Sequence, residues 1–220
     1  DPALANLQPL VDNTNPLFIR EGNPNLKPLF NNSISLGVRK YDVKKSLTYN
    51  ANLYGTNTKN ATIISRTIDV NGVQKSVPIN AEGTWSFGNS ISFQKDWKTT
   101  DKKISLIASN NVSVNNSYVL VNQEKSKFQS FQIRPSAEIR INLNDHFELN
   151  QSYSFSNSKS TYLSELFTDQ KLLFHDSRSE IIIRPTPKFV IESTLDYRYN
   201  SNSIPGLLKD YYKFNAAISY

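Results

Sequence analysis

Cysteine and methionine are both absent from the 220-residue chain. Without cysteine, a disulfide framework and a thiolate metal site are excluded. Long hydrophobic runs are missing as well, because no apolar stretch approaches the roughly 18 residues that a membrane-spanning helix requires. Only 38% of the residues are hydrophobic, and the mean hydropathy is −0.49. These absences exclude a helical membrane protein.

A concentrated basic surface is also missing, although the net charge is +6. The 25 Lys and Arg residues are scattered along the chain and interleaved with 19 Asp and Glu residues. Nucleic-acid binding depends on clustered cations that neutralise several phosphates at once. The charge pattern therefore predicts that the chain does not bind nucleic acid.

Residues for catalysis are scarce. The chain has two histidines, His146 and His175, each beside an aspartate. Adjacent residues of a strand face opposite sides, so Asp145 and His146 do not form a preorganised dyad. No glycine-rich phosphate loop, metal-ligand spacing or paired nucleophile and base stands out. We therefore predict that the chain is not an enzyme and binds neither a cofactor nor a metal.

What the sequence does contain is a strong alternation of apolar and polar residues. The alternation is clearest over residues 80–94, 131–143, 147–156, 189–200 and 212–220. A period of two is typical of β-strands, and turn residues such as Asn71-Gly72 separate the runs. We count about nine long strands joined by short connections, which predicts an all-β antiparallel meander.

The two faces of these strands differ in chemistry, and each predicts a different environment. In a membrane barrel, apolar residues point outward to lipid and polar residues point inward to a wet lumen. The residues predicted to face lipid are Trp85, Phe87, Ile91, Phe93, Phe131, Ile133, Ile139, Ile141, Tyr153, Phe155, Ile191, Leu195, Tyr197, Phe214 and Ile218. The residues predicted to face the lumen are Glu82, Arg134, Glu138, Arg140, Glu148, Glu192, Asp196 and Arg198.

Three features favour part of a transmembrane β-barrel over a soluble fold. The alternation keeps its phase from residue 77 to residue 93, about 56 Å at ~3.3 Å per residue, which is long for a soluble strand. Tight turns alternate with longer or more elaborate connections near residues 69–74, 122–126, 162–169 and 201–210, as in outer-membrane barrels. Aromatic residues beside the tight turns would form an interfacial girdle, namely Tyr41, Trp97, Phe147 and Phe189.

The alternative is a soluble or surface β-sandwich that acts as an adhesin or binding module. Strands of a sandwich also alternate, but their apolar face packs against a second sheet. The two hypotheses differ in the exposure of this face. A barrel wall leaves it uncovered by protein, whereas a sandwich buries it.

The first 30 residues follow a different pattern from the rest. They show no clear period and contain a concentration of proline, at Pro2, Pro9, Pro16, Pro24 and Pro28. Proline restricts its own backbone and that of the preceding residue to extended or turn geometry. We therefore divide the chain into a proline-rich loop segment, residues 1–30, that leads into the first strand, and a β-barrel wall segment, residues 31–220.

A specific motif lies at the end of this loop segment. It consists of Gly22, Asn23, Pro24, Asn25, Leu26, Lys27 and Pro28. Together with residues 7–9 and 15–20, it resembles the junction between an extracellular loop and a strand in TonB-dependent outer-membrane receptors, most closely the outer-membrane β-barrel family of Bacteroidetes. Those receptors usually have Glu after the motif, where this chain has Leu29. The resemblance covers the chain as a series of hairpins and is motif-specific over residues 7–40.

The resemblance implies a C-terminal segment of a larger barrel of about 22 strands, located in the outer membrane of a Gram-negative bacterium. It also implies a receptor or active importer whose partners are outer-membrane lipid, a plug domain and the remaining barrel strands of the same protein. An inner-membrane energy-coupling protein and a surface lipoprotein are further partners to expect. The transported ligand, whether a glycan, a siderophore complex or a peptide, is not specified by any residue.

Overall fold

The computed structural model describes residues 3–144, 146–165, 167–202 and 208–220. Within these ranges the chain is all-β, with 13 strands and one short helix, α1 (Leu4–Leu7). Among the described residues, no helix is long and apolar enough to cross a membrane. The prediction of an all-β fold is therefore confirmed.

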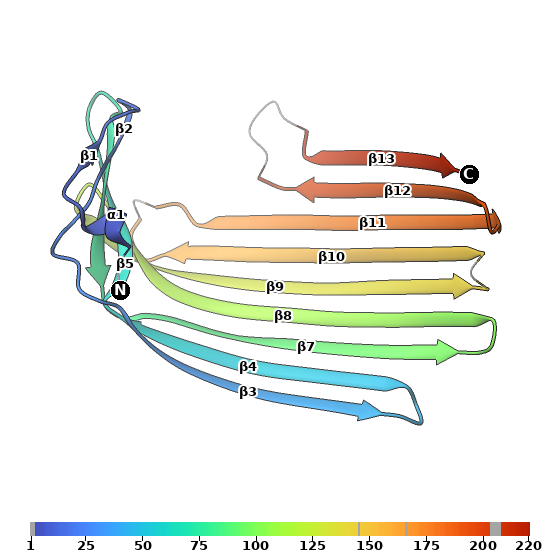
Figure 1. Cartoon of the computed structure of the whole chain (residues 1–220). Coiled ribbons are helices and arrows are strands. Elements are labelled where there is room, and N and C mark those ends of the chain that lie inside the picture. The colour runs from blue at the N-terminus through green and yellow to red at the C-terminus, as the bar shows by residue number, and fades with distance from the viewer. Residues whose placement is uncertain (1–2, 145, 166, 203–207) are drawn as a thin grey trace.

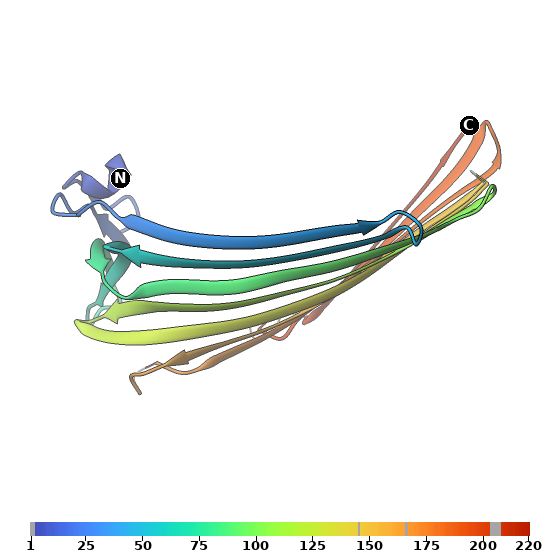
Figure 2. The same ribbon diagram turned by 90° about the horizontal axis from the view of Figure 1, so that it is seen from below.

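Nine of the 13 strands form one antiparallel meander, which we call the wall. Each wall strand pairs with its neighbour in the order β3-β4-β7-β8-β9-β10-β11-β12-β13. The sheet is long, twisted and bowed (Figures 1 and 2). The predicted count of about nine long strands therefore holds for the wall. Its strands are β3 (Phe30–Asp42), β4 (Leu47–Lys59), β7 (Thr84–Lys98), β8 (Lys102–Val121), β9 (Glu124–Leu143), β10 (Phe147–Tyr162), β11 (Gln170–Thr186), β12 (Phe189–Asn200) and β13 (Asp210–Ser219).

The remaining four strands form a small cap at one end of the wall (Figure 1). They are β1 (Val11–Asp12), β2 (Phe18–Glu21), β5 (Ala61–Ile68) and β6 (Gln74–Ala81). Two pairings in this region are parallel, β2 with β6 and β5 with β8, so the sheet as a whole is mixed, while the wall itself is the predicted antiparallel meander. The cap arises because the β5–β6 hairpin is inserted between two wall strands, β4 and β7, that pair with each other.

One predicted long strand is wrong. Residues 77–93 were expected to run straight through, but β6 ends at Ala81 and β7 begins at Thr84. Gly83 between them has φ +79°, a conformation that residues with a side chain rarely adopt, so the chain bends there. The longest strands are instead β8 and β9, with 20 residues each. Those two span about 66 Å at ~3.3 Å per residue, which is still far beyond ordinary soluble strands.

The connections alternate in kind, as predicted. The β3–β4, β7–β8, β9–β10 and β11–β12 turns lie together at one end of the wall, the tight-turn end (Figure 1). The cap and the longer connections lie at the other end, the loop end. One expectation differs, because β8 and β9 are joined by a tight turn of two residues, Asn122 and Gln123, both with positive φ. This geometry matches the twist of a long hairpin.

The small hydrophobic core lies in the cap and not in the wall. Leu26, Ala61, Ile63 and Ala81 are the buried hydrophobic residues of the described chain, each 3–9% exposed. Pro78 beside them is fully buried. The wall is a single layer, and no second sheet among the described residues covers its apolar face. The β-sandwich alternative is therefore wrong, since it requires that face to be buried.

Candidate functional site

The strand register places every predicted lipid-facing residue on one face of the wall, which we call the apolar face. Directly paired residues of neighbouring strands share a face. One such row joins Ile139, Gln151, Ser179, Leu195 and Phe214 across β9 to β13. A second row joins Phe87 of β7 through β8 to Phe131 of β9, and the remaining predicted residues follow the same parity.

Several large apolar side chains on the apolar face are strongly exposed. Phe87 is 50% exposed, Ile91 53% and Phe214 67%. Large apolar side chains that line a continuous exposed surface mark contact with another molecule or with lipid. That the apolar face contacts lipid stays a prediction and is developed below.

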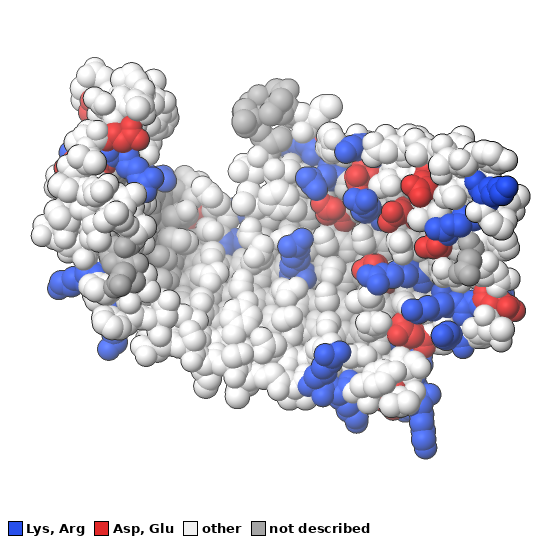
Figure 3. Space-filling model, in the orientation of Figure 1, with Lys and Arg blue, Asp and Glu red and all other residues white. Residues whose placement is uncertain are grey.

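The opposite face, the polar face, carries a lattice of acids and bases. One row across β9 to β13 reads Glu138, Ser152, Arg178, Asp196 and Lys213, so positive and negative side chains alternate around a serine. Figure 3 shows that the charged side chains seen on the wall gather toward the tight-turn end and mix both signs. Opposite charges that face each other across strands favour the pairing, whereas like charges disfavour it.

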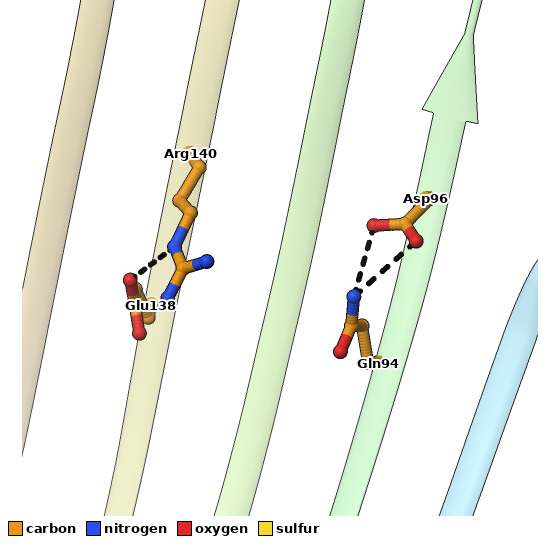
Figure 4. Close-up of polar contacts among 4 residues, drawn as sticks. All are labelled: Gln94, Asp96, Glu138 and Arg140. Carbon is orange, nitrogen blue, oxygen red and sulfur yellow. Dashed lines mark hydrogen bonds and ion pairs between the residues drawn. The ribbon is translucent and has the colours of Figure 1, made fainter.

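Four ion pairs connect this lattice. The Arg140 Nε atom lies 2.5 Å from the Glu138 Oε1 atom, on the same strand. Figure 4 shows this pair, with Gln94 and Asp96 of β7 joined by hydrogen bonds on the other side of β8. The other three pairs join neighbouring strands and are Arg178–Asp196, Arg198–Asp176 and Arg184–Glu148.

The polar face is hollowed between the charged rows. A shallow depression of 360 Å³ is lined by six polar residues of β9, β10 and β11, namely Glu138, Arg140, Asn150, Ser152, Arg178 and Glu180. A second depression of 460 Å³ lies beside the β7–β8 turn and shares Arg140 and Asn150 with the first. Both signs of charge are available in the same hollow, so this surface can hold polar or zwitterionic groups through paired hydrogen bonds.

Most predicted lumen-facing residues lie on the polar face, but one does not. Arg134, Glu148 and Glu192 follow the same register as the lattice described above. Glu82 is different, because it lies in the bend between β6 and β7, where its Oε1 atom accepts a hydrogen bond from the backbone N–H of Asn60 at 3.2 Å. The alternation failed at Glu82 because the strand assumed to contain it ends at Ala81.

Sequence reasoning missed the charged residues of β11. Asp176, Arg178, Glu180 and Arg184 all belong to the polar face, and all of them except Glu180 take part in three of the four ion pairs. Their period of two is present in the sequence. It is obscured because both faces of β11 mix polar and apolar residues, with His175 on the apolar face.

Two aromatic residues of the girdle predicted at the tight-turn end share the apolar face. Trp97 pairs with Ile104, and Phe147 pairs with Ile183, so both belong to the apolar face. Tyr41 pairs with Thr48, which pairs with Gln94, so Tyr41 belongs to the polar face. The prediction that Tyr41 belongs to a girdle on the lipid side is therefore wrong, because a shift of one residue along a strand moves a side chain to the opposite face.

The two histidines lie apart and have different surroundings. The Nδ1 atom of His146 lies 2.9 Å from the backbone oxygen of Arg184, next to a tight turn whose Asp145 lies outside the described residues. His175 lies among aromatic rings, and its Nδ1 atom is 2.6 Å from the Tyr153 hydroxyl oxygen. Within the described ranges, no group of three or more potential metal-binding side chains comes together.

The glycine of the family motif sits where the chain has no room for a side chain. A Cβ atom on Gly22 would lie 2.0 Å from the backbone oxygen of Gln8, so only glycine fits. The next residue, Asn23, donates through its backbone N–H to the oxygen of Asn6 at 2.6 Å. Its side chain donates to the oxygen of Pro78 in β6 at 3.0 Å. These contacts hold the loop segment against the cap.

The second half of the motif is clamped by one asparagine of β6. The Oδ1 atom of Asn80 accepts a hydrogen bond from the backbone N–H of Lys27 at 2.8 Å. The Nδ2 atom of Asn80 donates to the oxygens of Lys27 and Asn60, at 3.1 and 2.8 Å. Leu26 is buried between these contacts. The motif therefore fixes the direction in which the chain leaves the cap and enters β3.

The fold and its two faces define a class: the wall of an outer-membrane β-barrel. The comparison with known families agrees, since residues 2–220 match the model of the outer membrane protein beta-barrel family. The chain belongs to this family and is a component of the outer membrane of a Gram-negative bacterium. Members of such a family are usually not enzymes. A search among curated proteins returned no match.

Proposed function

We propose that the chain is a wall segment of an outer-membrane receptor or transporter of the TonB-dependent type, as found in Bacteroidetes. The apolar face contacts lipid, the polar face lines the lumen, and the cap lies at the cell surface. The observation that carries this proposal is a single two-faced sheet of nine long strands, of which both edge strands, β3 and β13, lack an outer neighbour among the described residues.

The chemistry of the apolar face supports contact with lipid. Three polar side chains on this face, from β10 and β11, are joined by hydrogen bonds, which lipid favours because it offers no hydrogen-bond partners of its own. The Gln151 side chain donates to the Ser177 hydroxyl at 3.1 Å and accepts a hydrogen bond from the Ser179 hydroxyl. An amide left alone in hydrocarbon would cost several kcal/mol.

The exposed edges support the proposal that further strands of the same protein complete the barrel. All residues of β13 and nearly all of β3 are exposed. Unpaired edges bind other strands or aggregate, and a closed barrel removes them. The remaining partners rest on the resemblance: a plug domain against the polar face, an energy-coupling protein of the inner membrane and a surface lipoprotein over the cap.

The orientation of the two faces can be tested with single-cysteine reporters, because the chain has no cysteine of its own. We would label Phe87→Cys and Phe131→Cys on the apolar face and Ser90→Cys and Ser152→Cys on the polar face of the complete protein in vesicles. Lipid-borne quenchers should act on the first pair, and water-soluble quenchers on the second. Equal quenching of both pairs by the aqueous probe would overturn the wall assignment.

The transporter part of the proposal needs a separate experiment. A photo-crosslinking residue at Arg178, in the charged hollow, should form an intramolecular crosslink to a segment of the complete protein that lies outside this chain. The same residue placed at Phe87 should not form it. If the residue at position 178 crosslinks to lipid, or forms no crosslink within the protein, the lumen holds no plug. The transporter part of the proposal would then fail, and an ungated barrel would remain.

A further inference from the structure

The apolar face carries an unusual pair of lysines at its loop end. Lys159 of β10 and Lys171 of β11 are direct partners across the two strands and therefore point to the same side. Lys159 is also paired with Phe131 of β9, one of the predicted lipid-facing residues. Like charges placed directly opposite each other destabilise a strand pair. An anion bound between the two ammonium groups would offset this repulsion.

No acidic side chain neutralises this pair in the described part of the chain. The ion pairs found there involve neither Lys159 nor Lys171. Asp169 lies two residues before Lys171, but its Oδ1 atom accepts a hydrogen bond from the Tyr162 backbone N–H at 3.0 Å. Both lysines are exposed. Their ammonium groups are thus available to a ligand.

The surface beside the pair offers further polar groups. Lys127 of β9 lies on the same face, closer to the loop end, and is exposed. It lines a hollow of 210 Å³ together with the Gln129 amide and the Thr161 hydroxyl. Amide and hydroxyl groups beside ammonium groups suit a ligand that combines phosphate with sugar hydroxyls.

Toward the middle of the wall, the lysines give way to aromatic residues. Phe155 and His175 are partners two rows below the lysine pair, about 13 Å along the strands at ~3.3 Å per residue. Their ring centroids are 5.1 Å apart, and the centroid of the His175 ring lies 5.5 Å from that of the Tyr199 ring. Directly below them lie Tyr153 and Ser177, then Gln151 and Ser179, and the aliphatic pair Leu149 and Ile181 follows. Aromatic residues mark the boundary of the hydrocarbon layer in membrane proteins, so the lysines lie at head-group level.

We propose that Lys127, Lys159 and Lys171 bind the phosphate of a phosphorylated glycolipid whose acyl chains lie along the apolar face of β9 to β11. This inference rests on the proposed contact of that face with lipid and adds a specific lipid class to it. The lysines lie closer to the loop end than the aromatic rings do, which matches a phosphate held outside the aromatic boundary of the hydrocarbon layer. Lysine is suited to the role because its flexible stem reaches a phosphate as a point charge.

The test uses the complete protein in detergent and two probes, phosphorylated lipid A and the same lipid without its phosphate. Native mass spectrometry would measure how much of each stays bound. The variant replaces the three lysines, as Lys127→Gln, Lys159→Gln and Lys171→Gln. A matched control replaces three exposed lysines at the tight-turn end, which are Lys40, Lys102 and Lys188.

We expect the wild type and the control to prefer the phosphorylated probe, and the triple variant to lose roughly tenfold or more in its binding. Heat-dependent gel migration would establish that each variant is folded. Equal binding of the two probes, or equal loss in the control, would overturn the site. The quenching experiment on Phe87 and Phe131 separates the two failures. If lipid contact persists without phosphate preference, this inference fails while the wall assignment stands.

Discussion

A charge placed at the centre of the apolar face tests the two-faced wall most directly. Ile91 is the middle residue of β7 and is 53% exposed on that face. If the face meets lipid, Ile91→Arg puts a guanidinium near the middle of the bilayer. Arginine on the lipid face of a barrel strand costs about 2–4 kcal/mol at mid-depth. At 1.4 kcal/mol per factor of ten, the folding equilibrium should fall by about one and a half to three orders of magnitude.

The control is the next residue of the same strand. Ser90 has the same depth but belongs to the polar face, where it pairs with Asn52 and Asn111. Ser90→Arg should cost below about 1 kcal/mol, because the lumen is wet and polar substitutions there are tolerated. Reversible urea unfolding of the complete barrel in vesicles would measure both changes. The reasoning is refuted if the two variants lose equal stability, or if Ser90→Arg loses more.

Three further predictions concern the cap and the charged lattice. Gly22→Ala should destabilise the cap by about 1–3 kcal/mol, because its Cβ would overlap the Gln8 carbonyl oxygen; unchanged resistance to limited proteolysis at the surface of whole cells would contradict this. Asn80→Ala removes three hydrogen bonds to backbone groups, at about 1 kcal/mol each, and should speed hydrogen exchange over residues 22–28; exchange as slow as in the wild type would count against the clamp. A double-mutant cycle on Arg178 and Asp196, whose side chains are 55% and 30% exposed, should give a coupling of roughly 0–1 kcal/mol; a coupling of several kcal/mol would show that the polar face is much drier than described.

Strand type and facing could be predicted from the sequence for most of the wall. In β9, the alternation from Phe131 to Leu143 is complete, so parity alone assigned Ile133 and Arg134 to opposite faces, and the register agrees. The reason is that a single layer has one period, and each residue contributes independently to one of two surfaces.

The errors occur where a distant segment determines the local structure. The bend at Gly83 separates β6 from β7, and β7 pairs with β4, so the intervening hairpin leaves the wall. An isolated reading of residues 77–93 cannot detect this, because both halves keep the alternation. The position of Glu82 and the parallel pairing of β5 with β8 were not predicted for the same reason. Tyr41 was misplaced because proximity to a turn does not specify a face.

By itself, the sequence determined that the chain forms long two-faced strands and which side chains share each face. Those properties follow from the period of two and require no partner. Only the tertiary structure decided which strands are neighbours, that the β5–β6 hairpin builds a cap held by Asn80, and that Lys159 faces Lys171. These features depend on register between segments far apart in the chain. Register is set by backbone pairing across the whole sheet, which no local pattern records.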